Sequence, residues 1–128
     1  MRDREVGGQP IANFQGLRWK LVDMYKEIEG ARGLLYRACM SGKPFPDPTQ
    51  AALAKMVCNE MVWKVTADAV QMHGGYGYTD EYAVSRHFRA GRAGGLGGGT
   101  PDILRNMIAK TLFDKVTPDD GLAALPTF

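Results

Sequence analysis

Four stretches of the chain carry apolar residues at helical spacing, and none shows the strict alternation of a β-strand. The longest stretch runs from about Pro10 to Ser41, and Pro10 suits a first helical turn because its missing N–H has no partner there. Steps of three and four residues separate its apolar positions, which are Phe14, Leu17, Leu21, Met24, Ile28, Ala31, Leu35 and Ala38. At about 1.5 Å per residue the pattern predicts a helix on the order of 45 Å long, packed along its length against other helices.

A Pro-rich breaker, SGKPFPDPT, separates this helix from a second one that ends near His73. Either Asp47 or Thr49 is expected to cap the second helix, with Pro48 in its first turn. Apolar residues occupy nearly every face of the second stretch, so we expect it to lie mostly buried, inside a bundle or between subunits.

Two shorter helices are predicted after the turn HGGYGYTDEY and after the loop AGGLGGG. The first runs from about Asp80 to Arg92, and the second starts at Thr100 and ends near Val116. The pattern therefore predicts an all-α fold, a helical bundle over residues 1–116, followed by a tail, residues 117–128, with no helical period.

Composition narrows the classes of partner. Sixteen basic and fourteen acidic residues give a net charge of +2, too small to predict a nucleic-acid or membrane-surface partner. The chain has no run of about 18 apolar residues and no signal-peptide core, so we expect a cytoplasmic protein. Cys39 and Cys58 lack CxxC spacing and are interpreted as buried free thiols, and no metal site is predicted.

The segment GGGTPDIL, residues 97–104, is the strongest local candidate for a site. Thr100 is expected to cap a helix that starts at Pro101, with Asp102 in its first turn. Such a helix start leaves backbone N–H groups that favour a phosphate, a carboxylate or a thioester oxygen. An ordinary capped helix after a flexible loop explains the same pattern. The segment lacks the GK[ST] of a P-loop and the preceding strand of a Rossmann fingerprint.

A second candidate is QMHGGYGY, residues 71–78. Gly74, Gly75 and Gly77 permit positive φ and the close approach of a backbone or a ligand. Gln71 offers an amide to a planar polar group. A helix C-terminus with tyrosines packed on it is the alternative interpretation.

Four motifs in matching order and spacing resemble the acyl-CoA dehydrogenase family. Residues 4–15 resemble its Arg-x-x-Phe-Gly-x-x-Ile-x-x-x-Gln stretch, and residues 71–78 resemble Gln-x-x-Gly-Gly-x-Gly-Tyr. Residues 86–90 are similar to its Arg-x-x-Arg-Asp segment, and residues 99–103 to its Gly-Thr-x-x-Ile helix start. The resemblance spans about residues 4 to 112 and implies the family's C-terminal helical domain, here an incomplete four-helix bundle whose first helix is absent.

The resemblance also implies contacts with FAD, many of them across a subunit interface. Arg4 would meet the pyrophosphate with Gln15 nearby, while Thr100 and Asp102 would lie near the flavin and Gly98 and Gly99 near the substrate. The adenosine portion would lie along five successive residues, which are Gln71, Met72, His73, Gly74 and Gly75. In the family's reaction a carboxylate removes the α-proton of an acyl-CoA thioester and the β-hydride passes to the flavin. The electrons then leave through an electron-transferring flavoprotein.

Departures from the family pattern change what this chain is expected to do. Many members place the catalytic Glu immediately before the Gly-Thr pair, but Gly98 stands there and offers no base, so no catalytic residue is assigned. Some relatives supply the Glu from a helix before the Arg-x-x-Phe-Gly stretch, a helix that these residues do not include. Gly7 replaces the usual Phe, Ala90 the usual Asp, and Asp102 a commoner Gln or Glu.

The family enzyme also has a helical N-terminal domain and a β-domain, and 128 residues do not contain them. We therefore expect no tight FAD binding by this chain alone. We also expect an uncovered apolar face on its long helix, which favours self-association as a homo- or hetero-oligomer or else poor solubility. Three hypotheses remain open. The chain is a fragment of an acyl-CoA dehydrogenase that is inactive in isolation, a non-catalytic partner that completes a site in another chain, or a bundle with an unrelated role.

Overall fold

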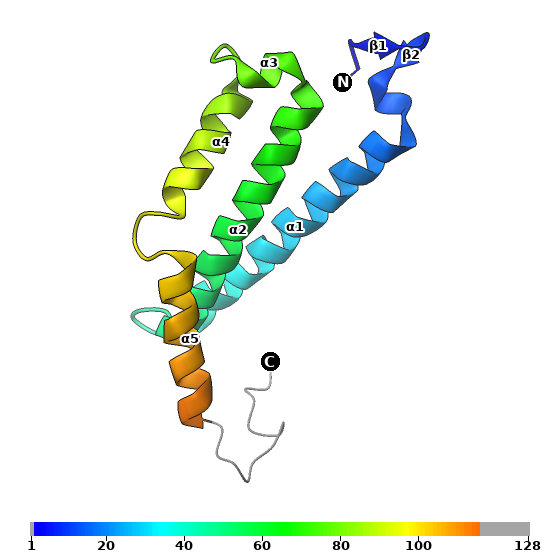
Figure 1. The fold of residues 1–128 in the computed structure, drawn as a ribbon. Coiled ribbons are helices and arrows are strands. Elements are labelled where there is room, and N and C mark those ends of the chain that lie inside the picture. The colour runs from blue at the N-terminus through cyan, green and yellow to red at the C-terminus, as the bar shows by residue number, and fades with distance from the viewer. Residues whose placement is uncertain (1, 116–128) are drawn as a thin grey trace.

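The computed structural model describes residues 2–115, and helices make up most of this part of the chain (Figure 1). Its helices are α1 (Gln15–Met40), α2 (Pro48–His73), α3 (Gly75–Tyr78), α4 (Ala83–Gly94) and α5 (Pro101–Lys115). The all-α prediction is confirmed. The predicted end of the last helix at Val116 and the predicted tail lie outside the described residues.

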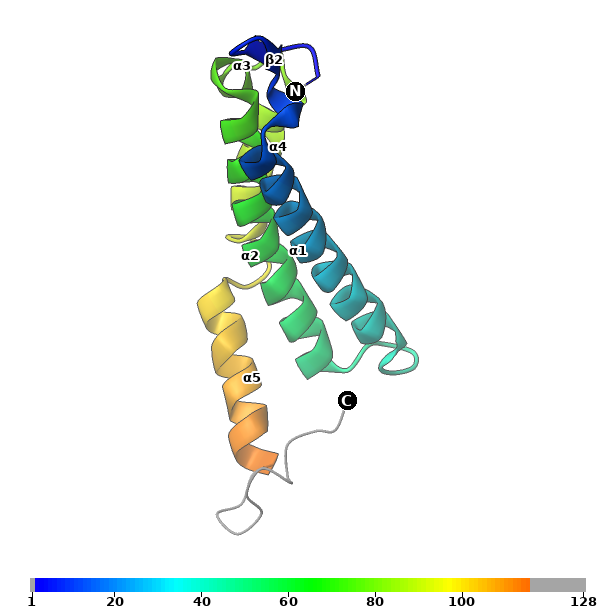
Figure 2. The same ribbon diagram turned by 90° about the vertical axis from the view of Figure 1, so that its right-hand side faces the viewer.

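Helix α2 is the central element of the fold. It packs against α1 on one side and against α4 and α5 elsewhere along its length. Helices α1 and α2 pack together at an angle, and α5 lies beside the first turns of α2 and continues past them (Figures 1 and 2). Most α2 side chains are half-buried, and Ala52, Ala54 and Thr66 are fully buried, which agrees with the apolar pattern on nearly every face.

The predicted start of the first helix at Pro10 is wrong. Two short strands, β1 (Glu5–Val6) and β2 (Gln9–Pro10), pair antiparallel, and a 3-10 turn, η1 (Ile11–Asn13), follows them. Gly7 and Gly8 form the hairpin turn with φ values of +61° and +77°. Two successive positive φ angles are the geometry that glycine pairs provide at such turns. A strand of two residues is too short to show alternation, so the sequence pattern could not reveal this hairpin.

The ends of the other helices follow their capping residues. The Asp47 carboxylate accepts a hydrogen bond from the Gln50 N–H at 2.9 Å, so Asp47 is the cap of α2. Thr49 instead donates to the Thr111 hydroxyl at 3.2 Å and ties α2 to α5. The Thr100 hydroxyl faces the Ile103 N–H at 3.5 Å, as predicted for the cap of α5, although this bond is long. Helix α4 begins at Ala83 rather than Asp80, because Tyr82 is extended.

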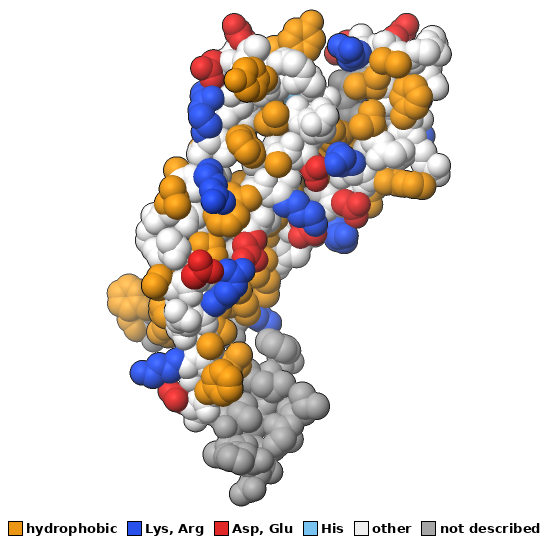
Figure 3. Space-filling view, viewed as in Figure 1, with side chains coloured by type: hydrophobic (Ala, Val, Ile, Leu, Met, Phe, Trp, Pro, Cys, Tyr) orange, Lys and Arg blue, Asp and Glu red, His pale blue; other side chains and the backbone are white. Residues whose placement is uncertain are grey.

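Small residues form the buried core, and large apolar residues remain on the surface. The fully buried apolar residues are Ala31, Ala38, Ala52, Ala54 and Leu104. Helix α1 exposes large side chains along its length, namely Trp19, Leu21, Val22, Tyr25, Leu35, Tyr36 and Met40. Apolar side chains are also exposed over much of the face in Figure 3. The prediction of an uncovered apolar face on the long helix is therefore confirmed, while self-association through it stays a prediction.

Helices α1 and α2 also carry the two cysteines and two ion pairs that join them. Both cysteines are free, but Cys39 is exposed and Cys58 half-buried, so the prediction of buried thiols is wrong for Cys39. Two ion pairs join the helices, Lys20–Asp68 at 2.5 Å and Lys64–Glu27 at 2.6 Å. Within residues 2–115, no helix is long and apolar enough to cross a membrane.

Candidate functional site

The residues predicted to bind ligand lie in two groups at different levels of α2. Gln71 and Gly74 lie at the C-terminal end of α2, near the N-terminal hairpin. The glycine loop before α5 lies against the first half of α2, where the Lys55 ammonium donates to the Gly97 carbonyl at 2.8 Å. Lys55 and Gln71 are separated by about 24 Å along the helix, at about 1.5 Å per residue. The structure therefore does not bring the Gln71 and Thr100 regions of one chain together.

The first group surrounds a hollow of about 760 Å³. Its lining residues are Asp3, Arg4, Glu5, Ile11, Leu21, Met24, Ala69, Met72, His73, Tyr76 and Tyr82. Of the predicted FAD contacts, Arg4, Met72 and His73 line this hollow. Gln15, Gln71, Gly74 and Gly75 are exposed and do not line it. The lining combines one guanidinium and two neighbouring carboxyl groups with apolar and aromatic side chains.

The aromatic wall depends on how α2 ends. Gly74 has φ +62°, which stops the helix, and the His73 ring hydrogen-bonds the Ala69 carbonyl at 2.8 Å. The ring centre of Tyr82 lies 5.3 Å from that of Tyr76 and 6.2 Å from that of His73. The glycine-rich segment is thus a helix end with packed tyrosines, and the same tyrosines form one wall of the hollow.

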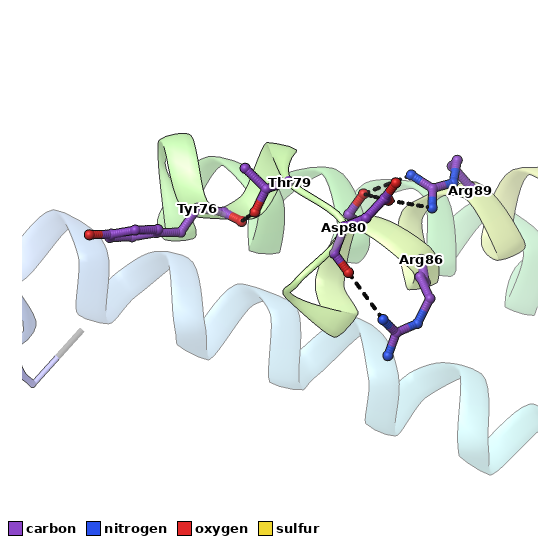
Figure 4. A network of polar contacts seen from close by, with 6 residues as sticks. Tyr76, Thr79, Asp80, Arg86 and Arg89 are labelled. Carbon is purple, nitrogen blue, oxygen red and sulfur yellow. Dashed lines mark hydrogen bonds and ion pairs between the residues drawn. The ribbon is translucent and has the colours of Figure 1, made fainter.

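A polar network centred on Asp80 fixes the turn between α3 and α4 (Figure 4). The Asp80 carboxylate accepts from the Arg89 guanidinium at 2.7 Å and from the Ser85 hydroxyl at 3.4 Å. The Asp80 carbonyl accepts from Arg86 at 3.2 Å, and Arg89 also donates to Ser85 at 2.8 Å. Arg86 and Arg89 therefore hold the turn that positions Tyr82. Asp80 was expected at the start of a helix, and this role in the turn was not predicted.

The Asp80–Arg89 pair makes the turn sensitive to acid. The hydrogen bond and charge of Arg89 hold the pKa of Asp80 below its ordinary value of 3.8. A carboxyl whose pKa is lowered by folding stabilises the folded state above its unfolded pKa, and this contribution is lost as the pH falls through the folded pKa. We expect the NMR signal of the Arg89 side chain to stay constant down to about pH 4 and to shift below it. Asp80→Asn should abolish that shift and the matched Asp114→Asn should keep it, whereas an identical titration in Asp80→Asn would contradict the assignment.

The second group is the glycine loop and the start of α5. Gly98 and Gly99 have φ values of +65° and +98°, a backbone conformation that glycine adopts without strain. Gly95 lies against the ring of Trp63, whose indole N–H donates to the Gly91 carbonyl at 2.9 Å. The Arg92 guanidinium lies 4.4 Å from the centre of the same ring. These contacts fix where the loop begins, and none was foreseen from the sequence.

At the start of α5, the predicted site residues are partly engaged. The Asp102 carboxylate pairs with Arg105 at 2.9 Å, and Arg105 also pairs with Glu60 of α2. Gly98 presents no side chain, and the nearest group to a side chain built there is the Lys55 ammonium. No cluster of potential metal ligands is found in the part of the chain that the structure describes.

Comparisons with known proteins bear on the family and the fold of the chain. Residues 1–113 match the sequence model of the family described as "Acyl-CoA dehydrogenase, C-terminal domain". The chain is 41% identical over 125 residues to a 3-sulfinopropanoyl-CoA desulfinase of Cupriavidus necator, covering 98% of this chain and 32% of that protein. Butyryl-CoA dehydrogenase from Megasphaera elsdenii has a similar structure, with a TM-score of 0.82 and 37% identity over 88% of this chain and 30% of the other. A structure titled "FAD complex of PigA" gives a TM-score of 0.80 at 29% identity, covering 88% and 30% of the two chains. The chain thus spans about a third of the length of the curated relatives that it matches.

Proposed function

Because this chain belongs to the acyl-CoA dehydrogenase family, we propose that it serves as the C-terminal helical domain of an FAD-dependent enzyme acting on an acyl-CoA thioester. One structural observation supports the proposal in addition to family membership. Arg4 and the end of α2 border one hollow, while the glycine loop and the start of α5 form a second group far along the same helix. A long helix with one partial site near each end suits a long ligand that is bound between two chains.

The hollow fits the adenosine end of FAD. The Arg4 guanidinium, which lines the hollow with Asp3 and Glu5 on either side in the sequence, suits a pyrophosphate, because a planar guanidinium forms charge-assisted hydrogen bonds to phosphate oxygens. Tyr76 and Tyr82 offer aromatic surface to a planar base. Gly74 and Gly75 lie beside the hollow without side chains that would block a close approach.

The two groups would serve two different flavins. Since about 24 Å of α2 separates them, the adenosine group of one chain and the Thr100 group of a second chain would meet the same cofactor. The exposed apolar surface of α1 supports such an assembly, whether of identical or different subunits. For a dehydrogenation in this assembly, bound FAD would supply the two-electron acceptor, and an electron-transferring flavoprotein would be the partner for re-oxidation. We place the assembly in the cytoplasm.

Dehydrogenation in this assembly needs a base that residues 2–115 do not supply at the family's Gly-Thr motif. A glutamate at position 98 would have to adopt φ +65°, which costs a residue with a Cβ about 1–2 kcal/mol. A carboxylate from elsewhere in the assembly would then remove the α-proton, or this chain would be a non-catalytic partner. Gly98 is the observation that keeps the second possibility open.

Desulfination of 3-sulfinopropanoyl-CoA is the specific reaction we favour over general dehydrogenation. Four similar relatives carry the name 3-sulfinopropanoyl-CoA desulfinase, at 41–45% identity. The absence of a carboxylate at Gly98 supports it too, because a negative side chain there would repel an anionic acyl group. The whole reaction belongs to a protein about three times as long as the match.

Replacing Arg4 by glutamine tests the proposed flavin site. In the assembled FAD protein we expect Arg4→Gln to weaken FAD binding about 10- to 100-fold, since hydrogen bonds to charged groups contribute about 1.5–3 kcal/mol. Arg2→Gln is the matched control, because Arg2 is exposed and does not line the hollow. Flavin fluorescence during titration measures both affinities. Equal affinities for the two variants, or micromolar FAD binding by the isolated chain, would contradict the proposal.

A further inference from the structure

The Lys55 side chain reaches the place where the family's Gly-Thr motif usually carries its acid. Its ammonium lies 3.2 Å from the position that a Cβ on Gly98 would occupy. The hydrogen bond to the Gly97 carbonyl, at 2.8 Å, holds the ammonium against the loop. A cation from α2 therefore stands beside Gly98, where a glutamate would have placed a negative charge.

The charge of Lys55 is not balanced within the described residues. The other lysines of α1 and α2 each pair with a carboxylate, as Lys20–Asp68, Lys26–Asp23 and Lys64–Glu27. Across residues 2–115, no carboxylate pairs with Lys55, whose hydrogen bond goes to a neutral carbonyl. Glu60 of α2 and Asp102 at the start of α5 are both engaged by Arg105.

A second donor near Lys55 also has no partner among the described residues. One helical turn further along α2, the Asn59 Nδ2 is buried without a hydrogen-bond partner. Asn59 faces Gly94, at the other end of the same glycine segment. An ammonium has three donors, and the Gly97 carbonyl uses one of them. Two donors near this glycine segment, the Lys55 ammonium and the Asn59 amide, therefore keep hydrogen-bonding capacity that the described residues do not use.

We propose that Lys55 selects acyl-CoA substrates whose acyl chain ends in an anion, by binding that anion beside Gly98 and Gly99. The inference rests on the proposed function, because it takes the acyl group to lie along this loop. A sulfinate and a carboxylate share the chemistry that an ammonium recognises, namely a compact negative group with acceptor oxygens. Lys55 is thus a specificity-determining residue, and it is not the base.

Substrate affinities of Lys55 variants test this role. The experiment uses the assembled FAD protein and three probes, which are 3-sulfinopropanoyl-CoA, 3-carboxypropanoyl-CoA and butanoyl-CoA. Dissociation constants come from the change in flavin absorbance on titration. The preference is the ratio of the constant for neutral butanoyl-CoA to that for each anionic probe.

We expect Lys55→Met to lower this preference about tenfold or more and to leave butanoyl-CoA binding nearly unchanged. Lys55→Arg keeps the cation and should retain most of the preference. Lys64→Met, on the same helix but paired with Glu27, is the matched control and should retain all of it. If Lys55→Met weakens the binding of both anionic probes equally, Lys55 recognises the negative charge. If it weakens only the binding of 3-sulfinopropanoyl-CoA, Lys55 recognises the sulfinate group.

Two other results separate the failure of this inference from that of the proposed function. If the wild-type protein binds acyl-CoA but Lys55→Met keeps the preference for anionic probes, the inference is wrong and the proposed function stands. If Lys55→Met weakens butanoyl-CoA binding as much as it weakens binding of the anionic probes, then Lys55 only holds the loop in place. This result too would overturn its assignment as a specificity-determining residue. If the wild-type protein binds none of the three, both are wrong.

Discussion

Replacing Gly95 with alanine is expected to destabilise the protein by about 3 kcal/mol, the upper end of the usual cost of overpacking. A Cβ at this position would overlap the Cζ2 atom of Trp63 and lie 2.7 Å from its Cε2 atom. The indole cannot turn away freely, because its N–H is bonded to the Gly91 carbonyl and Arg92 lies over its face. The added methyl group would therefore separate α4 from α2 at the point where the glycine loop begins.

The neighbouring residue supplies a sharp control. A Cβ on Gly94 would meet nothing closer than the Asn59 side-chain oxygen at 3.8 Å, an ordinary contact. Gly94 lies in helix α4, where alanine is favoured over glycine by about 0.5–1 kcal/mol. In urea unfolding, the midpoint of Gly95→Ala should lie well below that of the wild type, and the midpoint of Gly94→Ala should lie at or above it. Equal midpoints for the two variants would show that the Trp63 contact does not constrain the loop.

Gly77→Ala should have the second largest effect, a loss of about 2–3 kcal/mol together with weaker FAD binding. Gly77 is buried in α3, and a Cβ there would lie 2.6 Å from the Val70 carbonyl oxygen and 2.9 Å from the His73 Cβ. The Val70 contact is with backbone inside α2, so relief requires moving α3 itself. That movement would displace Tyr76 and the aromatic wall of the hollow.

Gly75→Ala is the control for this change, because a Cβ on Gly75 meets no atom within 4 Å and its φ is not positive. Thermal unfolding followed by circular dichroism measures the stability, and near-ultraviolet dichroism reports the packing of the tyrosines. We expect both signals to change in Gly77→Ala and neither in Gly75→Ala. A stable Gly77→Ala variant with native tyrosine signals would mean that α3 can shift without cost.

The helical part of the fold was predictable because long helices leave a clear record in a sequence. Helices α1 and α2 have 26 residues each, so the three- and four-residue steps between apolar positions repeat many times. Asp47 and Pro48 marked the start of α2 by chemistry that depends only on neighbouring residues. The hairpin at Gly7 and Gly8 escaped prediction because its strands have two residues each.

The site was predictable only in pieces. Short motifs located the turn after Gln71 and the start of α5 at Thr100, since glycines and capping residues act locally. Their separation depends on the straight course of α2 and on where the loop meets it, at Lys55, which no local pattern encodes. Lys55 itself stood out in no motif, because a single lysine on a helix usually faces water.

The fluorescence of the two tryptophans of the chain can report separately on two of its surfaces. Trp19 is 61% exposed on α1, whereas the Trp63 ring lies against Gly95 and beneath Arg92. A subunit that covers α1 would move the Trp19 emission towards the blue, while a ligand that rearranges the glycine loop would change the quenching of Trp63. Single-tryptophan variants would let each event be followed in solution without any added dye.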